Sequence, residues 1–250
     1  MRYGYWMPVF GGWLRNVPDE GMEATWDYAK RLAQASERWG YDLTLIAELN
    51  LNDIKGVEQP ALDAWSTAAA LAAVTERLEL MVAVRPNFHH PALFAKTAAN
   101  IDRIAGGRLS LNVVSSWWAD EARQYGLQFD QHDDRYARTT EWLDVVDGLW
   151  REDRFSYQGR FYTTEDAICA PKPKSPPIIY AGGESDAAKA MIAAATSWPP
   201  SLVRASSSRT SSIAPTRQTT PAPMRMPISS PDSKTCRRKG IRQATSVAAA

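Results

Sequence analysis

Apolar residues alternate between two periods along the first 195 residues. Short runs rich in Val, Ile and Leu predict strands, and apolar residues at helical spacing predict helices between them. The strands are expected at 3–9, 42–48, 79–86, 108–114 and 176–183, and the helices at 25–40, 63–78, 91–107, 135–150 and 185–195. Because the strands are apolar on both faces, we expect a parallel sheet covered by helices.

The expected architecture is an α/β fold of the TIM (β/α)8 type. A spacing of roughly 30 to 40 residues per strand–helix unit fits such a barrel, whose functional loops follow the carboxyl ends of the strands. An open doubly wound sheet is the alternative, but the stretch VFGGWL (9–14) after the first strand lacks a G-x-G-x-x-G pattern and opens no helix. Only about five units precede residue 181, so we expect an incomplete barrel.

The composition changes after residue 195. Residues 196–250 contain nine Lys and Arg and one acidic residue, so this segment carries a formal charge of about +8 and residues 1–195 about −7. It is rich in Ser, Thr, Pro and Arg and has no apolar period, so it cannot bury enough apolar surface to offset its ordering entropy. We therefore divide the chain into a barrel portion, 1–195, and a disordered basic tail, 196–250. An out-of-frame translation near residue 195 and a genuine disordered extension are two hypotheses for this tail.

Several classes of protein are disfavoured by composition. No apolar run reaches the ~20 residues that cross a bilayer, and the start lacks signal-peptide features, which predicts a cytoplasmic location. Two distant cysteines and three histidines suggest neither a disulfide framework nor a metal site. The basic run at 237–239 lacks interleaved aromatic residues, which indicates solvated charge and no nucleic-acid partner.

Polar residues gather where the predicted fourth strand ends. Asn112 interrupts the apolar run, and Ser115 to Glu121 follow it at the end of the strand where a TIM barrel keeps its chemistry. Asn112 could instead be a hydrogen-bonded polar group of the core. Trp117 and Trp118 could line a substrate cavity or simply pack within the loop.

The segment after the third strand offers further candidates. His89 and His90 lie at the same end of the predicted barrel and could serve as acid, base or hydrogen-bond donor, or could be a solvated loop pair. Arg85 could bind a substrate anion or form an ion pair with an acid at the barrel end. We favour the ion pair.

Four motifs resemble one family. The stretches GGRLSLNVVSSWWADEARQYG (106–126), HDDRYARTTEWLDVVDGLW (132–150), FSYQGRFYTTEDAICAPKP (155–173) and PPIIYAGGESDAA (176–188) are similar to those of the bacterial luciferase-like flavin monooxygenases. The likeness covers about residues 1–195 and is greatest to the branch of alkanesulfonate, dimethyl sulfone and pyrimidine monooxygenases. It implies a TIM barrel that uses reduced FMN (FMNH2) and O2. It also implies a separate NAD(P)H-dependent flavin reductase and, in the intact family form, a homo-oligomer.

The resemblance also assigns site residues, which share a position near the flavin or its phosphate. The implied cofactor-binding residues are Glu48, Asn112, Glu121, Arg135, Tyr136 and Ser185. Glu48 and Leu49 stand where the pyrimidine enzymes have an Ile-Lys pair, so this position departs from the family pattern. The candidate catalytic residues are His89, His90 and Trp117, and Trp6, Phe10 and Trp13 suit the exclusion of water from the site.

The function implied is insertion of one oxygen atom into a small organic substrate through a flavin C4a-peroxide. An organosulfur compound, a sulfonate or a sulfone, is the expected substrate class. The sulfonate enzymes have a cysteine just before the D-A-W helix start, where this chain has Ala61 and Leu62, so a sulfonate is not established. The alternatives are an F420-dependent oxidoreductase on the same fold and a non-functional, truncated flavin-binding remnant.

Overall fold

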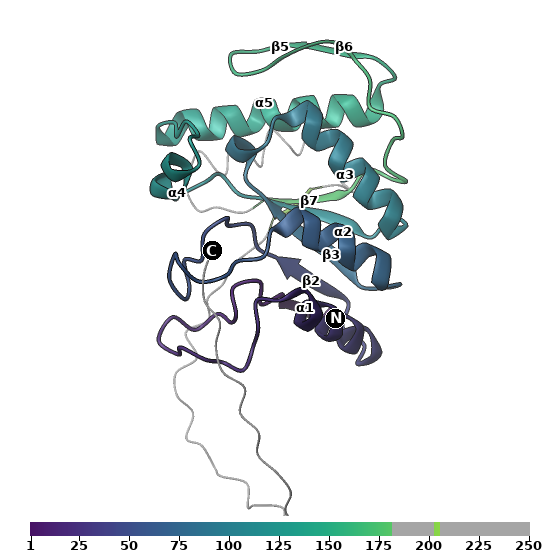
Figure 1. Cartoon of the computed structure of the whole chain (residues 1–250). Coiled ribbons are helices and arrows are strands. Elements are labelled where there is room, and N and C mark those ends of the chain that lie inside the picture. The colour runs from purple at the N-terminus through teal and green to yellow at the C-terminus, as the bar shows by residue number, and fades with distance from the viewer. Residues whose placement is uncertain (182–202, 206–250) are drawn as a thin grey trace, which may run out of the picture. The chain divides into compact units, whose positions relative to one another are not determined.

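A computed structural model describes residues 1–181 and 203–205 of the chain. Its main feature is a sheet of six parallel strands in the order β1-β2-β3-β4-β7-β8 (Figure 1). The strands are β1 (Gly4–Trp6), β2 (Leu43–Ile46), β3 (Glu79–Val84), β4 (Leu109–Val113), β7 (Ile178–Ala181) and β8 (Val203–Ala205). All five neighbouring pairs are parallel, as the alternation of strands and helices predicts.

Helices connect the strands and follow one another along one side of the sheet (Figure 1). They are α1 (Trp26–Arg38), α2 (Ala64–Val74), α3 (Pro91–Ala105), α4 (Ala119–Gln124) and α5 (His132–Arg151), with a 3-10 turn η1 (Pro86–Phe88) before α3. Thr25 and Asp63 cap the amino ends of α1 and α2 with their side-chain oxygens. Gly106 ends α3 at a φ of 67°, a left-handed conformation that glycine adopts without strain.

The core lies between the helices and one face of the sheet. The side chains of Leu80, Val82 and Leu111 lie on this face, toward the helices, and have no exposed surface. The opposite face of the sheet carries a row of residues aligned by the strand register, in which Leu45, Met81, Ser110 and Ile178 are successive partners. Side chains alternate between the two faces along each strand, so one row packs on helices and the other faces the interior expected of a barrel.

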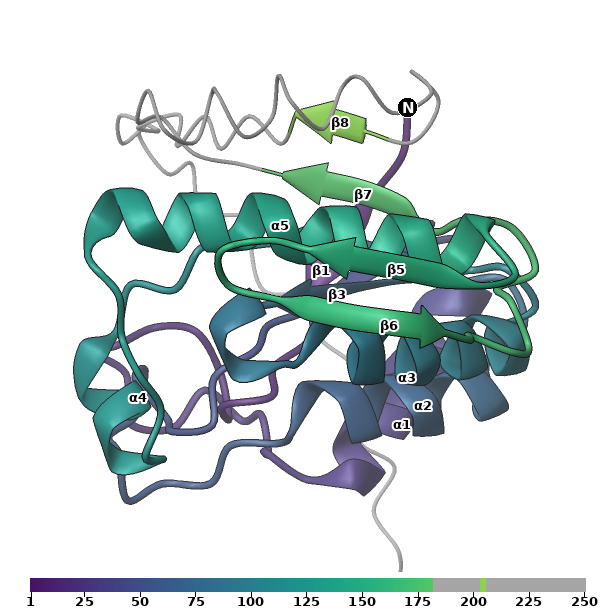
Figure 2. The ribbon, with the colours of Figure 1, turned by 90° about the horizontal axis from the view of Figure 1, so that it is seen from above.

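The predicted fold class is confirmed, with differences in detail. The five predicted strands and the four predicted helices up to residue 150 are present with shifted ends, while the helix expected at 185–195 lies outside the described residues. The chain also forms an antiparallel hairpin of β5 (Phe155–Gln158) and β6 (Thr163–Ala167), which packs along α5 (Figures 1 and 2). Neither this hairpin nor α4 was expected, because their sequences lack an apolar period.

The sheet also has one more strand than the sequence indicated. β8 lies within the segment for which we expected no ordered element, and its three residues pair with β7. Three residues are too few to show a period, so only the pairing of their backbone with β7 identifies them as a strand. The rest of 196–250 lies outside the described residues, and its disorder stays a prediction.

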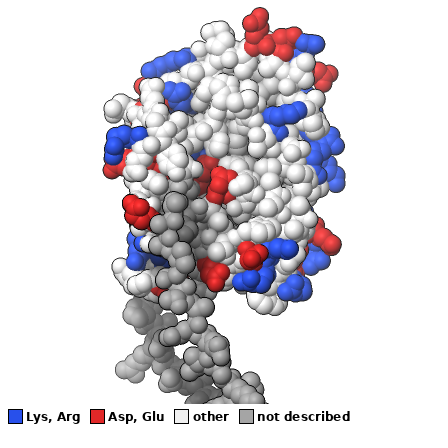
Figure 3. All heavy atoms as spheres, in the orientation of Figure 1, with Lys and Arg blue, Asp and Glu red and all other residues white. Residues whose placement is uncertain are grey.

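Neither positive nor negative charge dominates the face of the protein seen in Figure 3. Basic and acidic side chains are interspersed there, with wide uncharged areas between them. Within the described ranges, no helix combines the length and the apolar character needed to cross a bilayer.

Asp102 gives a test of pH-dependent stability. This α3 residue is 1% exposed, and its Oδ2 accepts the backbone N–H of Lys174 at 2.8 Å. Burial raises the pKa of Asp102 above the ordinary carboxyl value. Folding therefore favours the protonated form, so the contribution of Asp102 to stability is greatest below the unfolded pKa and is lost as the pH rises through the folded pKa.

We expect Asp102→Asn, which keeps an acceptor for Lys174, to melt at a higher temperature than the parent chain at pH 7. The difference should shrink as the pH falls from the raised pKa of Asp102 toward the ordinary carboxyl pKa, and it should stay small below that value. Thermal unfolding followed by circular dichroism at several pH values measures this, with the exposed Asp133→Asn as the control. A difference that stays constant over the whole pH range would contradict the expectation.

Candidate active site

The carboxyl ends of β1 to β4 and the loops after them surround an apolar cavity of about 270 Å³. Four aromatic side chains form much of its wall: Trp6, Phe10, Trp13 and Trp117. The rings of Trp6 and Trp13 meet edge to face with centroids 4.9 Å apart, and Phe10 contacts Trp13 in the same way at 5.3 Å. Trp6 and Trp117 are 54% and 56% exposed, so their rings are available to cover a bound molecule and shield it from water.

Asn112 brings an amide to this cavity. It lies on β4, in register with Ala83 of β3 and Tyr180 of β7, and it lines the cavity beside Ala83. The side chain is half-buried, and among the described residues its amide makes no hydrogen bond. The hydrogen-bonded core amide stays an alternative, because residues 182–202 after the neighbouring strand β7 lie outside the described part of the chain. At this position the amide of Asn112 can offer both a donor and an acceptor to a ligand.

Two buried polar side chains hold the loops that carry the aromatic wall. Asn52 has no exposed surface, and its amide donates to the carbonyl oxygens of Phe10 at 2.9 Å and Pro60 at 2.7 Å. The Lys55 Nζ atom lies 2.6 Å from Glu20 Oε1, and this bond holds the pKa of Glu20 below its usual value. The loop after β1 is thus tied to the loop after β2, which explains how the wall keeps its shape. The sequence showed no signal for this role of Asn52 and Lys55.

A buried charge cluster lies beside the cavity. Arg85, at the end of β3, forms an ion pair with both oxygens of Glu121, and its Nε is 3.6 Å from Glu48 Oε2. Arg85 is 2% exposed, Glu121 0% and Glu48 7%. The guanidinium also lies over the ring of Phe88, 3.9 Å from its centroid. The expected ion pair of Arg85 is confirmed.

Glu48 and Glu121 have protein partners for their carboxylates. Glu48 accepts the indole N–H of Trp65 at 2.9 Å, and it bonds His89 Nε2 at 2.5 Å. Glu121 accepts the backbone N–H of Asn50 at 2.6 Å in addition to Arg85. Glu121 has no exposed surface, and its carboxylate oxygens are bonded by Arg85 and Asn50. The contact of Glu121 with a cofactor stays a prediction. Glu48, by contrast, lines the apolar cavity.

The two histidines lie in different surroundings. Both line a second hollow of about 280 Å³, which we call the outer hollow and which also includes Gln128, Arg138 and Tyr162. His90 is exposed and its ring meets the ring of Tyr162 at 5.9 Å, where burial raises the pKa of the phenol. Only His89 contacts the charge cluster. The sequence offered no reason to distinguish the two histidines. In the structure they differ, because His89 bonds a buried carboxylate and His90 is exposed.

The residues expected at the cofactor phosphate are only partly placed. Arg135 lies in the first turns of α5, where Nη1 donates to the Asp130 carbonyl oxygen at 2.9 Å, and its buried Nε has no partner among the described residues. Tyr136 packs against the ring of His132 at 5.1 Å. Neither Arg135 nor Tyr136 lines the apolar cavity. Ser185 lies outside the described residues.

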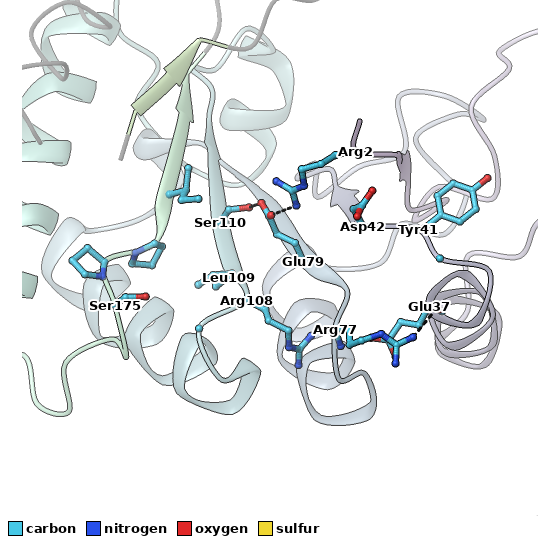
Figure 4. Close-up of a pocket in the computed structure, with 15 residues that line it drawn as sticks. Arg2, Glu37, Tyr41, Asp42, Arg77, Glu79, Arg108, Leu109, Ser110 and Ser175 are labelled. Carbon is cyan, nitrogen blue, oxygen red and sulfur yellow. Dashed lines mark hydrogen bonds and ion pairs between the residues drawn. The ribbon is translucent and has the colours of Figure 1, made fainter. Parts of the chain in front are cut away.

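A third hollow, of about 490 Å³, opens at the amino ends of the strands (Figure 4). One ion pair lies among its charged residues, and the other charged side chains bond backbone groups or hydroxyls. Arg2 bonds Glu79, which raises the pKa of Arg2, and Ser110 donates to Glu79 at 2.6 Å. Because polar groups at this end of a barrel commonly serve stability, we do not place the active site there.

The fold and the cavity define a β/α protein of the TIM-barrel type with a site at the carboxyl ends of its strands. The chain belongs to the luciferase-like monooxygenase family, because the sequence model of this family matches residues 1–206.

Known relatives and structures agree with this assignment. The chain is 35% identical over 201 residues to an FMNH2-dependent dimethylsulfone monooxygenase of Pseudomonas putida, covering 79% of this chain and 55% of that protein. It is 30% identical to the pyrimidine monooxygenase RutA of Escherichia coli, covering 77% and 54%. The EDTA monooxygenase of Chelativorans sp. BNC1 has the same fold, with a TM-score of 0.66, 22% identity and coverage of 76% and 53%. The chain thus spans about half the length of the curated relatives it matches.

Proposed function

We propose that this chain forms the flavin-facing part of a reduced-FMN-dependent monooxygenase that acts on a small organic substrate with O2. The observation that carries the proposal is the aromatic-lined cavity at the strand ends, with the amide of Asn112, which makes no hydrogen bond among the described residues, on its wall. A flat, largely apolar ring system with a polar edge fits such a cavity. The reduced flavin, when bound, supplies the chemistry with O2.

The chain's own residues would hold the flavin and protect it. The Asn112 amide would bond the polar edge of the ring system, and Trp117 with the other wall residues would exclude water. Arg135 would contribute to the phosphate site, since its buried Nε lacks a partner among the described residues. Tyr136 and Ser185 join this phosphate site by family resemblance alone. His89 and His90 are the candidates for proton transfer, and only His89 has a carboxylate to orient it.

The finer assignments follow the family. We propose a small organosulfur substrate, a sulfone or a sulfonate, because one relative is a dimethylsulfone monooxygenase. The relatives named FMNH2-dependent also support a separate NAD(P)H-dependent flavin reductase as partner. A homo-oligomer in the intact family form is proposed by family resemblance alone. The same relatives favour FMN over F420.

Flavin binding tests the proposal first. We expect the parent chain to bind reduced FMN in an anaerobic fluorescence titration, and Asn112→Ala to raise the Kd about 10-fold, because a hydrogen bond in a buried site contributes about 1.5 kcal/mol. Asn100→Ala is the matched control, because Asn100 is exposed on α3. Failure of the parent chain to bind FMN, or equal Kd values for the two variants, would contradict the assignment.

Oxygen-dependent formation of product then separates the alternatives. A monooxygenase converts dimethyl sulfone with reduced FMN and O2, whereas an F420-dependent oxidoreductase transfers hydride without O2. Product is measured because free reduced FMN consumes O2 by itself. Binding of FMN without conversion of any sulfone or sulfonate tested would support the flavin-binding remnant.

A further inference from the structure

The carboxylate of Glu48 accepts hydrogen bonds from three residues, one on α2 and two in the segment that follows β3. Trp65 Nε1 lies 2.9 Å from Oε1, the backbone nitrogen of Arg85 lies 2.6 Å from Oε2, and His89 Nε2 lies 2.5 Å from Oε1. The side chain of Glu48 is 5% exposed, so water does not replace these partners. The group is therefore a fixed part of the structure at the boundary of the apolar cavity.

The chemistry of the partners determines which atoms carry protons. An indole N–H and a backbone N–H can only donate, so each oxygen of Glu48 already acts as an acceptor. His89 Nε2 faces Oε1 as well. An unprotonated Nε2 would place its lone pair against the carboxylate, so Nε2 must carry a proton and donate it to Oε1. Nε2 thus carries a proton, and in the neutral ring Nδ1 is the acceptor.

The other ring nitrogen of His89 faces different surroundings. Nδ1 has no hydrogen-bond partner among the described residues, the side chain is 26% exposed, and it lines the outer hollow. His90 lines the same hollow without a carboxylate partner in the described residues, and His132 is an exposed residue at the start of α5. One of the three histidines of the chain is therefore oriented by a buried acid.

We propose that Glu48 is the positioning residue of His89: it holds the Nε2–H of the ring and leaves Nδ1 as a hydrogen-bond acceptor for an N–H or O–H group in the outer hollow. Trp65 supports this arrangement by holding the carboxylate. A carboxylate that fixes the tautomer and orientation of an imidazole is a recurring device in protein sites. The use of Nδ1 as a base rests on the proposed function, whereas the orientation of the ring does not.

Nuclear magnetic resonance tests the orientation without any turnover. In the full chain labelled with ¹⁵N-histidine, an imidazole N–H held by a buried carboxylate exchanges slowly with water and gives a downfield proton signal. We expect one such signal, assigned to Nε2 and lost in His89→Gln. The downfield signal should also be lost in Glu48→Gln, because a neutral amide oxygen accepts more weakly than a carboxylate and the amide nitrogen then faces one of the donors that now bond Oε1 or Oε2.

Two matched variants complete the experiment. Trp65→Phe removes the indole N–H and keeps a ring, so the signal should persist, and His90→Gln should leave it unchanged. The proposal is overturned if the parent chain lacks the signal, if the signal survives in Glu48→Gln, or if it belongs to His90 or His132. Circular dichroism of Glu48→Gln and Trp65→Phe checks that both variants are folded.

Kinetics connect this pair to the proposed function. With reduced FMN and dimethyl sulfone, Glu48→Gln and His89→Gln should each lower kcat by about 10- to 100-fold, since loss of an orienting partner commonly has an effect of this size. KM should stay unchanged, and the control Asn100→Ala, at an exposed position on α3, should keep the parent kcat. Equal kcat values in the parent chain and Glu48→Gln would overturn the positioning role. A parent chain that shows the signal but binds no FMN would support the orientation of His89 and refute the proposed function.

Discussion

Replacement of Arg85 by methionine is expected to destabilise the folded chain by about 3–5 kcal/mol. The guanidinium neutralises Glu121, which has no exposed surface, and it lies 3.6 Å from Glu48 Oε2. Without Arg85, the buried carboxylate of Glu121 keeps, among the described residues, only the backbone N–H of Asn50 as a partner, and no guanidinium separates it from Glu48. Urea unfolding followed by tryptophan fluorescence measures the loss.

The double variant Arg85→Met, Glu121→Gln separates charge from packing. It removes the uncompensated charge, so we expect it to recover more than half of the lost stability. Arg123→Met is the control, because Arg123 pairs with Asp120 on the surface with a side chain that is 74% exposed, and it should change stability by less than about 0.5 kcal/mol. A double variant as unstable as Arg85→Met would show that packing, rather than charge, holds this region.

Trp142→Ala should cost a similar amount, about 3–5 kcal/mol, through the cavity it leaves. Trp142 lies on α5 with no exposed surface, and its ring lies 4.6 Å from that of Phe94 on α3. Its Nε1 also donates to the carbonyl oxygen of His89 at 2.8 Å. The same side chain thus contributes to the core and holds the backbone next to the oriented histidine.

The two contributions of Trp142 can be measured apart. Trp142→Phe keeps most of the apolar contact and loses the bond to His89, so we expect a smaller loss, of about 1–2 kcal/mol. Trp39→Ala is the control, since Trp39 is 71% exposed. If Trp142→Phe is as unstable as Trp142→Ala, the hydrogen bond and not the volume of the ring dominates.

Much of the fold could be predicted because its signals are local. The apolar runs that became β2, β3 and β4 are short and bounded by helices at 3.6-residue spacing, so each element shows its own period. Asn112 was found because an amide inside an apolar strand is unusual. Elements without a period were missed, as the polar strand β6 and the three-residue strand β8 show.

The partners within the site could not be predicted in the same way. His89 and Trp65 meet Glu48 across 41 and 17 residues of sequence, and Arg85 meets Glu121 across 36. No local pattern couples such positions, because the strand register and the loop paths bring them together. The ion pair of Arg85 could be expected as a type of interaction, but its partner could not be named from the sequence.

The sequence by itself determined the alternation of strands and helices, the end of the sheet at which polar residues gather, and the family to which the motifs belong. The tertiary structure alone decided which side chains share a cavity, which carboxylates are buried and which histidine is oriented. The physical reason is that periodicity is set by neighbours along the chain, whereas burial and pairing depend on distances between strands and loops that no local pattern encodes.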